Sequence, residues 1–469
     1  MKKNLISVKG WIAPIVIYLF MLLITCGAAS VVPMENWGGR YLAGVFAELA
    51  GMNALVAHLL AGTALFAVFA GMLCLSGRKG SRNVWLTGLL AVALPTAVYS
   101  QSYGSLNGAV TVVPAVALGL FYMVLVEKLL DEPKKQASYA LPLFLMGLAT
   151  PLFHEVPGLG LCILSVGMTV KYWKRGLWTL LLHSLVVCGG TIFALLSSDN
   201  VLLFSNVLSQ AGAVVDNVLA GNWPMLILLT AACLLLIQPL RAERSKRCNQ
   251  ILRDLLVPVA VFALCPYLKT VAPFAAIVKI LFAVVYAVGV RKTIHVYVHR
   301  EARRHRLYRL LLATVAVALP LVLMDGQNDG LMLLPCLLLG AATLLLWGYA
   351  VQHFANLERF CRKLAPVVGI LALSCCVWIA ACNGLTDEAR REYSRNQEAL
   401  GATEVCLPEY PFADYRAEEA AALEGVTVEY CPWEEWDWES YFAAHRSADT
   451  DDGEEYENPV PTITKEEEE

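Results

Sequence analysis

The chain has 469 residues, of which 58% are hydrophobic and only 16% are charged, and its mean hydropathy is +0.58. This balance excludes a soluble globular protein, because long apolar runs separated by short basic clusters are typical of chains that cross a membrane several times. The net charge of −3 hides an asymmetry, since residues 1–382 hold 30 Lys and Arg against 14 Asp and Glu, whereas residues 383–469 hold 6 against 25.

The apolar runs predict about thirteen membrane spans, because each approaches the roughly 20 residues that a helix needs to cross the hydrocarbon core. We therefore expect an all-α protein, a polytopic transmembrane helical bundle. If the short runs at 137–153 and 156–170 form one re-entrant hairpin, the number falls to about eleven. The predicted spans lie near residues 11–32, 55–75, 84–99, 110–126, 137–153, 156–170, 177–196, 224–240, 254–271, 273–290, 310–324, 331–350 and 365–382.

Alternate connections between these runs are basic, and the others hold almost no Lys or Arg. The basic connections include "MKKNLISVKG", "SGRKGSR", "RAERSKRCNQILRD" and "RKTIHVYVHREARRHRLYR". The positive-inside rule then places the N-terminus in the cytoplasm and the C-terminus outside, in a multi-pass protein of the plasma membrane. The most basic connection is interpreted as an inner anchor beside anionic lipid rather than as a nucleic-acid site.

The weakly charged outer connections contain two apolar but interrupted stretches, at 41–50 and 201–219. Such stretches favour helices that lie in the membrane interface. After the last run, residues 383–447 are predicted to form a small extracytoplasmic appendage, which rests on the membrane through Trp433, Trp436 and Trp438. Residues 448–469 are expected to be a disordered acidic tail. Cys406 and Cys431 either form a disulfide in this appendage or remain two thiols.

Candidate chemistry is confined to a few acids at the outer ends of the predicted spans. The sequence has no Gly-rich phosphate loop, no paired Cys-x-x-Cys and no His-x-x-x-His within a span. An acid near membrane level is costly, so Glu35 and the His154–Glu155 turn are functional candidates. Asp325 and Asp329 are interpreted as turn formers.

Several outer stretches carry a family resemblance. "NWGGRYLAG" resembles the Trp-x-Gly-Arg motif of a family of uncharacterised bacterial polytopic membrane proteins. "YSQSYGSLNGAVTVVP" and "GLATPLFHEVPGLG" are similar to that family's second and third outer loops. The family in turn resembles, more remotely, glycosyltransferases of the GT-C fold, which take a sugar from a polyprenyl-phosphate carrier on the outer face.

The resemblance implies roles for five residues. Glu35 matches the key acid of the first outer loop, and Glu155 is the loop glutamate; both are expected to be catalytic. Trp37, Arg40 and His154 are expected to bind substrate, with Arg40 holding the lipid phosphate. The neighbouring aspartates usual in GT-C enzymes are missing from the first loop, so a retained fold with altered catalysis is the alternative.

The implied partners are membrane lipid, a polyprenyl-linked sugar, and a glycan or lipid acceptor, with no nucleic acid. No cofactor is indicated, and a divalent metal remains compatible with an acid such as Glu35. Two other functions are open: a lipid or glycan transporter or flippase, and a non-catalytic scaffold. A transporter predicts buried ion pairs within the spans, where Lys279 is the most obvious charge.

We predict that the acidic end of the chain is dispensable for membrane insertion, because its composition gives it almost nothing to bury. A chain truncated after Asp449 should accumulate in the membrane fraction as the full chain does. Immunoblotting of fractionated cells measures this, and loss of the truncated chain from the membrane would contradict it.

Overall fold

The computed structural model describes residues 9–25, 40–77, 81–197, 206–238, 246–265, 272–323, 329–399, 404–416, 427–436 and 438. Glu35, Trp37, Asp325 and the predicted tail at 448–469 lie outside these residues. The described part contains sixteen α-helices and two short β-strands.

Most of the helices are long and apolar. In chain order they are α1 (Lys9–Thr25), α2 (Tyr41–Met52), α3 (Ala54–Ser76), α4 (Ser81–Val92), α5 (Thr96–Ser102), α6 (Leu106–Asp131), α7 (Gln136–Phe153), α8 (Glu155–Tyr172), α9 (Trp178–Leu196), α10 (Val207–Val215), α11 (Trp223–Ile237), α12 (Lys246–Leu264), α13 (Ala272–Tyr297), α14 (Glu301–Leu323), α15 (Leu333–Val351) and α16 (Ala355–Ala399). Shorter elements are the 3-10 turns η1 (Pro133–Lys135), η2 (Trp173–Arg175), η5 (Asp329–Met332), η6 (Ala413–Tyr415) and η7 (Trp433–Glu435), the π-helix η3 (Asp216–Ala220), and strands β1 (Glu404–Pro408) and β2 (Thr427–Cys431).

The helices bear out an all-α polytopic bundle. Among the described residues, nine helices are long and apolar enough to cross a membrane, or eleven if two bent pairs each count as one span. The expected number of thirteen spans stays a prediction, because the spans expected at 11–32 and 254–271 extend into residues outside the described ranges. Within those ranges α1 is apolar but shorter than a span, and α12 starts with polar residues. The runs at 137–153 and 156–170 form two separate helices, α7 and α8, and both pass as candidate spans.

Two apolar helix pairs, each a broken span or a re-entrant loop, are bent where the helical hydrogen bonds are interrupted. Helices α4 and α5 meet at an 88° bend. Pro95 lies in this bend, directly before α5, and it interrupts the helical hydrogen bonds because it has no N–H to donate. The α10–η3 segment and α11 are bent by 63°, and the break falls at Gly221 and Asn222. Such breaks are tolerated in membranes where the freed polar groups meet protein rather than lipid.

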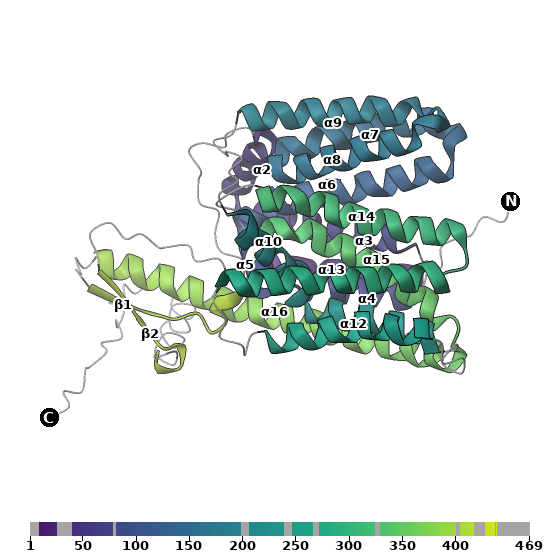
Figure 1. Cartoon of the computed structure of the whole chain (residues 1–469). Helices are drawn as coiled ribbons and strands as arrows, with labels where there is room; N and C mark the ends of the chain where they lie inside the picture. The colour runs from purple at the N-terminus through teal and green to yellow at the C-terminus, as the bar shows by residue number, and fades with distance from the viewer. Residues whose placement is uncertain are drawn as a thin grey trace.

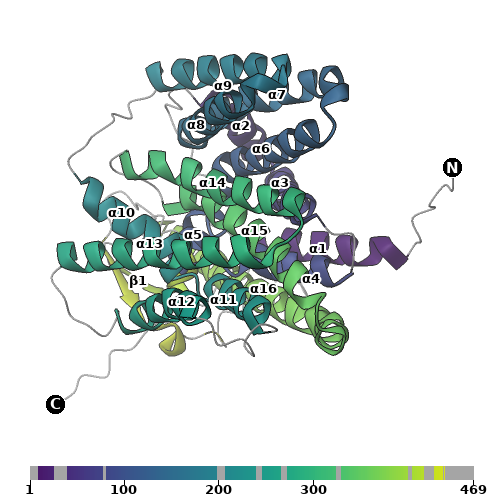
Figure 2. The ribbon, with the colours of Figure 1, turned by 45° about the vertical axis from the view of Figure 1, so that its right-hand side comes forward.

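Helices α6 and α15 form the centre of the bundle. Their apolar windows are 83% and 89% buried, whereas that of α13 is only 17% buried. Helix α6 packs against α3 and α7, and α15 packs against α3, α11 and α14, in agreement with their interior positions in Figures 1 and 2. Gly340 of α15 allows close packing, because a Cβ there would lie 2.4 Å from the methyl carbon of Met72.

Helices α2, α5 and α10 gather at one end of the bundle, the end from which α16 and the two strands project (Figure 1). The predicted topology makes this the outer end. The predicted interfacial stretches at 41–50 and 201–219 correspond to α2 and to α10 with η3, so both are helical where they are described.

Helix α16 is continuous over 45 residues, and it runs through the expected boundary between residues 382 and 383. Strands β1 and β2 pair in parallel, with Leu407 opposite Tyr430. The appendage is bound to α16 through Asp387. This carboxylate accepts a hydrogen bond from the Tyr410 hydroxyl at 2.9 Å and forms an ion pair with Arg416 at 2.5 Å. The membrane span and the appendage therefore share one helix.

Two tryptophans of the appendage contact this helix, and the expected contact of the appendage with the membrane stays a prediction. Trp433 donates its indole N–H to Thr386 at 3.0 Å. Trp436 is buried and packs edge-on against Tyr393, with ring centroids 5.0 Å apart. Cys406 and Cys431 are free thiols on the paired strands.

The topology predicts that the appendage is extracytoplasmic. A membrane-impermeant maleimide, applied to intact cells after mild reduction, should label the wild-type chain, and the Cys406→Ser/Cys431→Ser variant should lose that label. Mass spectrometry of the tail peptides measures the difference. Labelling that appears only after the cells are broken would reverse the orientation.

Candidate functional site

The candidate site lies where α2 begins and the α7–α8 turn ends. Of the residues singled out in the sequence, the structure brings together Arg40, His154 and Glu155. Glu35 and Trp37 belong to the segment before Arg40, which is outside the described residues. Asp329 is elsewhere, at the start of η5, where it accepts a hydrogen bond of 3.5 Å from Asn217.

His154 is the only residue between α7 and α8, and it sets their turn. Its extended backbone (φ −159°, ψ 127°) ends α7, and its imidazole Nδ1 accepts the Val156 N–H at 3.4 Å as the N-cap of α8. The two helices approach closely at this turn, since a Cβ on Gly158 would lie 2.5 Å from the Pro151 Cβ. The turn therefore holds Glu155 in the first position of α8.

Helix α2 is held against this turn by a small apolar cluster. Ala43, Ala115 and Phe153 are buried together, and Phe46 packs edge-on against Phe153 with ring centroids 4.9 Å apart. The opposite face of α2 is exposed, and apart from Glu48 its exposed residues are apolar. This packing places Arg40, the N-cap residue of α2, beside Glu155.

Arg40 and Glu155 form a two-pronged ion pair. The guanidinium Nε donates to Oε2 at 2.9 Å and Nη2 donates to Oε1 at 2.8 Å. The Glu155 side chain is fully buried, whereas that of Arg40 is 26% exposed. Paired N–H donors in a fixed fork are the strongest match for a carboxylate, and a buried carboxylate needs such a partner.

The imidazole of His154 lies beside the ion pair without adding charge. Its Nδ1 lies 3.4 Å from Glu155 Oε2, but this nitrogen accepts the Val156 N–H and has no proton to donate to the carboxylate. Burial lowers the pKa of His154 to about 4, so the ring is neutral at neutral pH. The charges of the site are therefore those of one cation and one anion.

This arrangement limits the chemistry of each group. Because both Glu155 oxygens accept hydrogen bonds from Arg40, this carboxylate is a poor general base and a good positioning group. Arg40 reaches the surface, and within the described residues its Nη1 makes no hydrogen bond, so it can meet an incoming anion. Across those same residues no group of three or more His, Cys, Asp or Glu side chains could hold a metal ion.

Sequence reasoning missed a second buried ion pair. Glu127 of α6 forms an ion pair with Arg309 of α14, in which Arg309 Nε donates to Glu127 Oε1 at 2.6 Å. Both residues are almost fully buried. The Tyr172 hydroxyl lies 3.4 Å from Arg309 Nη1. The available signal is Glu127 itself, an acid that directly follows the span predicted at 110–126.

The mid-span charge noticed in the sequence also has a partner. Lys279 of α13 donates to Asp216 of the π-helix η3 at 2.8 Å. Asn222, at the break that follows η3, is buried, and neither polar atom of its side chain has a hydrogen-bond partner within the described ranges. Lys279 alone could be seen in the sequence, because the break that brings Asp216 to it is a tertiary feature.

A scan against protein-family models, a search of curated proteins and a search of solved structures each returned no match. The resemblance to GT-C enzymes therefore stays a prediction, and the function is argued from the geometry of the chain.

We predict that the two partners of the ion pair differ in their effect on stability. Arg40→Met leaves a fully buried carboxylate without its guanidinium and should lower the free energy of unfolding by about 3–5 kcal/mol. Glu155→Gln leaves a guanidinium that can reach water and should cost only about 1–2 kcal/mol. Thermal unfolding in detergent measures both.

The double variant provides the decisive comparison. Arg40→Met/Glu155→Gln should be more stable than Arg40→Met alone, because the buried charge is gone. Glu48→Gln, on the exposed face of α2, serves as the control and should unfold like the wild type. Additive losses in the double variant would show that the two residues are not coupled.

Proposed function

We propose that this protein is an integral membrane glycosyltransferase, or a relative with that fold, which transfers a sugar from a polyprenyl-phosphate carrier on the extracytoplasmic face. The observation that carries the proposal is the position of Arg40. Its guanidinium is partly exposed at the start of a lipid-facing helix and is held in place by the buried carboxylate of Glu155. A cation held in this way suits the phosphate of a lipid-linked donor.

The surface of α2 supports a donor with a long hydrocarbon tail. Tyr41, Val45, Leu49 and Met52 are exposed by 41 to 80% and follow one face of the helix. Tyr41 also stacks on Phe193 of α9, with ring centroids 5.6 Å apart. In a membrane this face meets lipid, so a polyprenyl chain can lie along it while its phosphate reaches Arg40.

Within this proposal the five candidate residues have distinct roles. Arg40 binds the phosphate, and Glu155 with His154 positions Arg40. Glu35, five residues before Arg40, is the proton acceptor, because Glu155 is already occupied by its guanidinium partner. Trp37 is assigned to sugar binding, since an aromatic face packs well against a sugar ring.

The reaction then follows from these roles. The acceptor hydroxyl oxygen attacks the anomeric carbon of the donor sugar, and the bond from that carbon to the phosphate oxygen breaks. The lipid phosphate leaves with its electron pair and is stabilised by Arg40. Glu35 takes the proton of the acceptor hydroxyl as the new bond forms.

A transporter of lipid or glycan is the second candidate, and a specific contact favours it. The ion pair of Lys279 and Asp216 joins a long span to a π-helix beside a broken helix. Ionised groups and broken helices at membrane depth are features of transport pathways. A transporter moves the intact lipid, so the two functions differ in whether the sugar–phosphate bond is cleaved.

The proposal is tested with the full chain in proteoliposomes that contain polyprenyl-phosphate-linked hexoses and a mixture of hexose acceptors. Mass spectrometry of the lipid extract measures the release of free polyprenyl phosphate. The wild type should release it. Glu35→Gln should slow release by about 100-fold or more, the loss expected for a general base. Arg40→Lys should lower the affinity for the lipid-linked donor, because Lys keeps the positive charge but cannot donate two parallel hydrogen bonds to the phosphate.

Asp131→Asn, an exposed acid at the far end of α6, is the control and should behave like the wild type. Equal rates for Glu35→Gln and the wild type would remove Glu35 from the mechanism. If the donor lipid crosses the bilayer with its sugar still attached, the transporter reading replaces the enzyme.

A further inference from the structure

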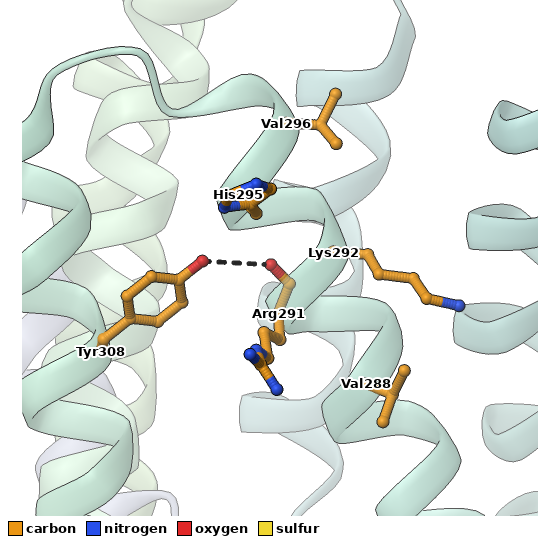
Figure 3. A pocket seen from close by; sticks show the side chains of 6 residues that line it. All are labelled: Val288, Arg291, Lys292, His295, Val296 and Tyr308. Atoms are coloured by element: carbon orange, nitrogen blue, oxygen red, sulfur yellow. Dashed lines mark hydrogen bonds between the residues drawn. The ribbon is translucent and has the colours of Figure 1, made fainter.

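A pocket lies at the end of α13 that leads into the most basic connection, away from Arg40. It has a volume of about 500 Å³ and is lined by Val288, Arg291, Lys292, His295, Val296 and Tyr308. Five of these residues come from α13, and Tyr308 approaches from α14 (Figure 3). By the predicted topology this is the cytoplasmic end of the two helices.

The lining is cationic and contains no acid. Arg291 and His295 are exposed on the face of α13 that is turned toward Tyr308, whereas Lys292 points to the other side of the helix (Figure 3). Lys292 donates to Asp254 of α12 at 2.8 Å, so its charge is already balanced. Arg304 lies close enough to the Tyr308 hydroxyl to act on it electrostatically. The pocket therefore offers an uncompensated positive charge.

Tyr308 supplies a polar group at the edge of the pocket. Its hydroxyl donates to the Arg291 carbonyl over 3.4 Å, a long bond that leaves it available to a better acceptor. A hydroxyl beside a guanidinium is a suitable pair of donors for a phosphate oxygen.

The same face of α13 continues toward the membrane centre as an exposed apolar stripe. Ile277, Leu281, Val284 and Val288 follow helical spacing and are exposed by 39 to 58%. On α14 a parallel stripe begins after Tyr308, and Leu312, Val315 and Leu319 are exposed by 45 to 65%. A cationic pocket at the end of two apolar stripes matches the shape of an amphiphile.

The two stripes are held apart at their far end. Helix α10 packs against both α13 and α14, and a Cβ on Gly212 of α10 would lie 2.8 Å from the Ala276 Cβ. Figure 1 shows α10 between the two helices at the opposite end from the pocket. Helix α10 therefore separates α13 and α14 at the outer end, and the pocket lies between them at the other end.

We propose that this pocket binds the headgroup phosphate of an anionic phospholipid of the inner leaflet, with its acyl chains along α13 and α14. Arg291 and His295 contact the phosphate, and Tyr308 donates a hydrogen bond to it. The choice of a lipid rests on the apolar stripes, and the choice of an anionic headgroup rests on the charge of the lining. This site is independent of the proposed sugar transfer at the outer end.

Native mass spectrometry of the full chain in detergent tests the proposal, with phosphatidylglycerol, phosphatidylcholine or inorganic phosphate added. Phosphatidylglycerol should bind more tightly than phosphatidylcholine. Arg291→Gln/His295→Gln should lower its affinity by about fivefold, the usual effect of one basic side chain at an anionic lipid surface. Equal affinity for the two lipids would overturn the proposal.

The matched control is Arg362→Gln/His353→Gln, which removes the same two residue types from exposed positions near the ends of α15 and α16. It should bind phosphatidylglycerol like the wild type, and an equal loss in this variant would mean a general charge effect. Displacement of the lipid by millimolar inorganic phosphate would assign the pocket to a soluble anion instead.

A second measurement needs no substitution and so does not depend on folding of a variant. Phosphatidylglycerol with a photoactivatable acyl chain, reconstituted with the wild-type chain, should crosslink to peptides of α13 and α14 between Leu281 and Leu319. Crosslinks spread evenly over the lipid-facing helices would overturn the site.

Discussion

A fully buried carboxylate in a membrane protein has to be balanced by a cation, and the contact of Glu155 with Arg40 satisfies this requirement. Glu155 is fixed in the first turn of α8 by the one-residue turn at His154, so the cation must come to it. Helix α2 provides this cation at its N-terminus. Ala43 and Phe46 pack against the cluster around Phe153, and this packing brings Arg40 to Glu155. One ion pair thus determines where the chain re-enters the bundle after its first apolar helix.

Among the described residues, ion pairs join separate helices at three more places, and the carboxylates of Glu127 and Asp254 are largely buried whereas that of Asp216 is half exposed. Glu127 pairs with Arg309 between α6 and α14, Asp216 with Lys279 between η3 and α13, and Asp254 with Lys292 between α12 and α13. Apolar packing between helices has little specificity in lipid, since lipid tails are as apolar as the side chains. These charged pairs therefore specify which helices are neighbours, while close contacts such as Gly340 against Met72 determine how near they lie.

The sequence predicts the coarse architecture because hydropathy and charge report directly on the solvent of each segment. It also predicts that Arg40 and Glu155 belong to the same end of the bundle, since both follow outer helix ends. It does not predict the partner of Glu127, because that residue and Arg309 are separated by 182 positions and share no periodicity. Nor does it predict that Trp433 binds Thr386, since an aromatic residue near a membrane suits lipid and protein equally well.

The continuity of α16 has a mechanical consequence for the appendage. Residues 383–399 extend the helix by about 25 Å beyond the last apolar run, at a rise of about 1.5 Å per residue. The chain after this extension folds back along it, since Arg390 donates to the Pro408 carbonyl at 2.6 Å and Asn383 donates to the Phe412 carbonyl at 2.9 Å. Tyr415 then packs edge-on against Tyr99 of α5, with ring centroids 5.4 Å apart. A partner that bound the appendage would therefore exert its force on α16 and on the outer end of the bundle, and not on a loosely tethered tail.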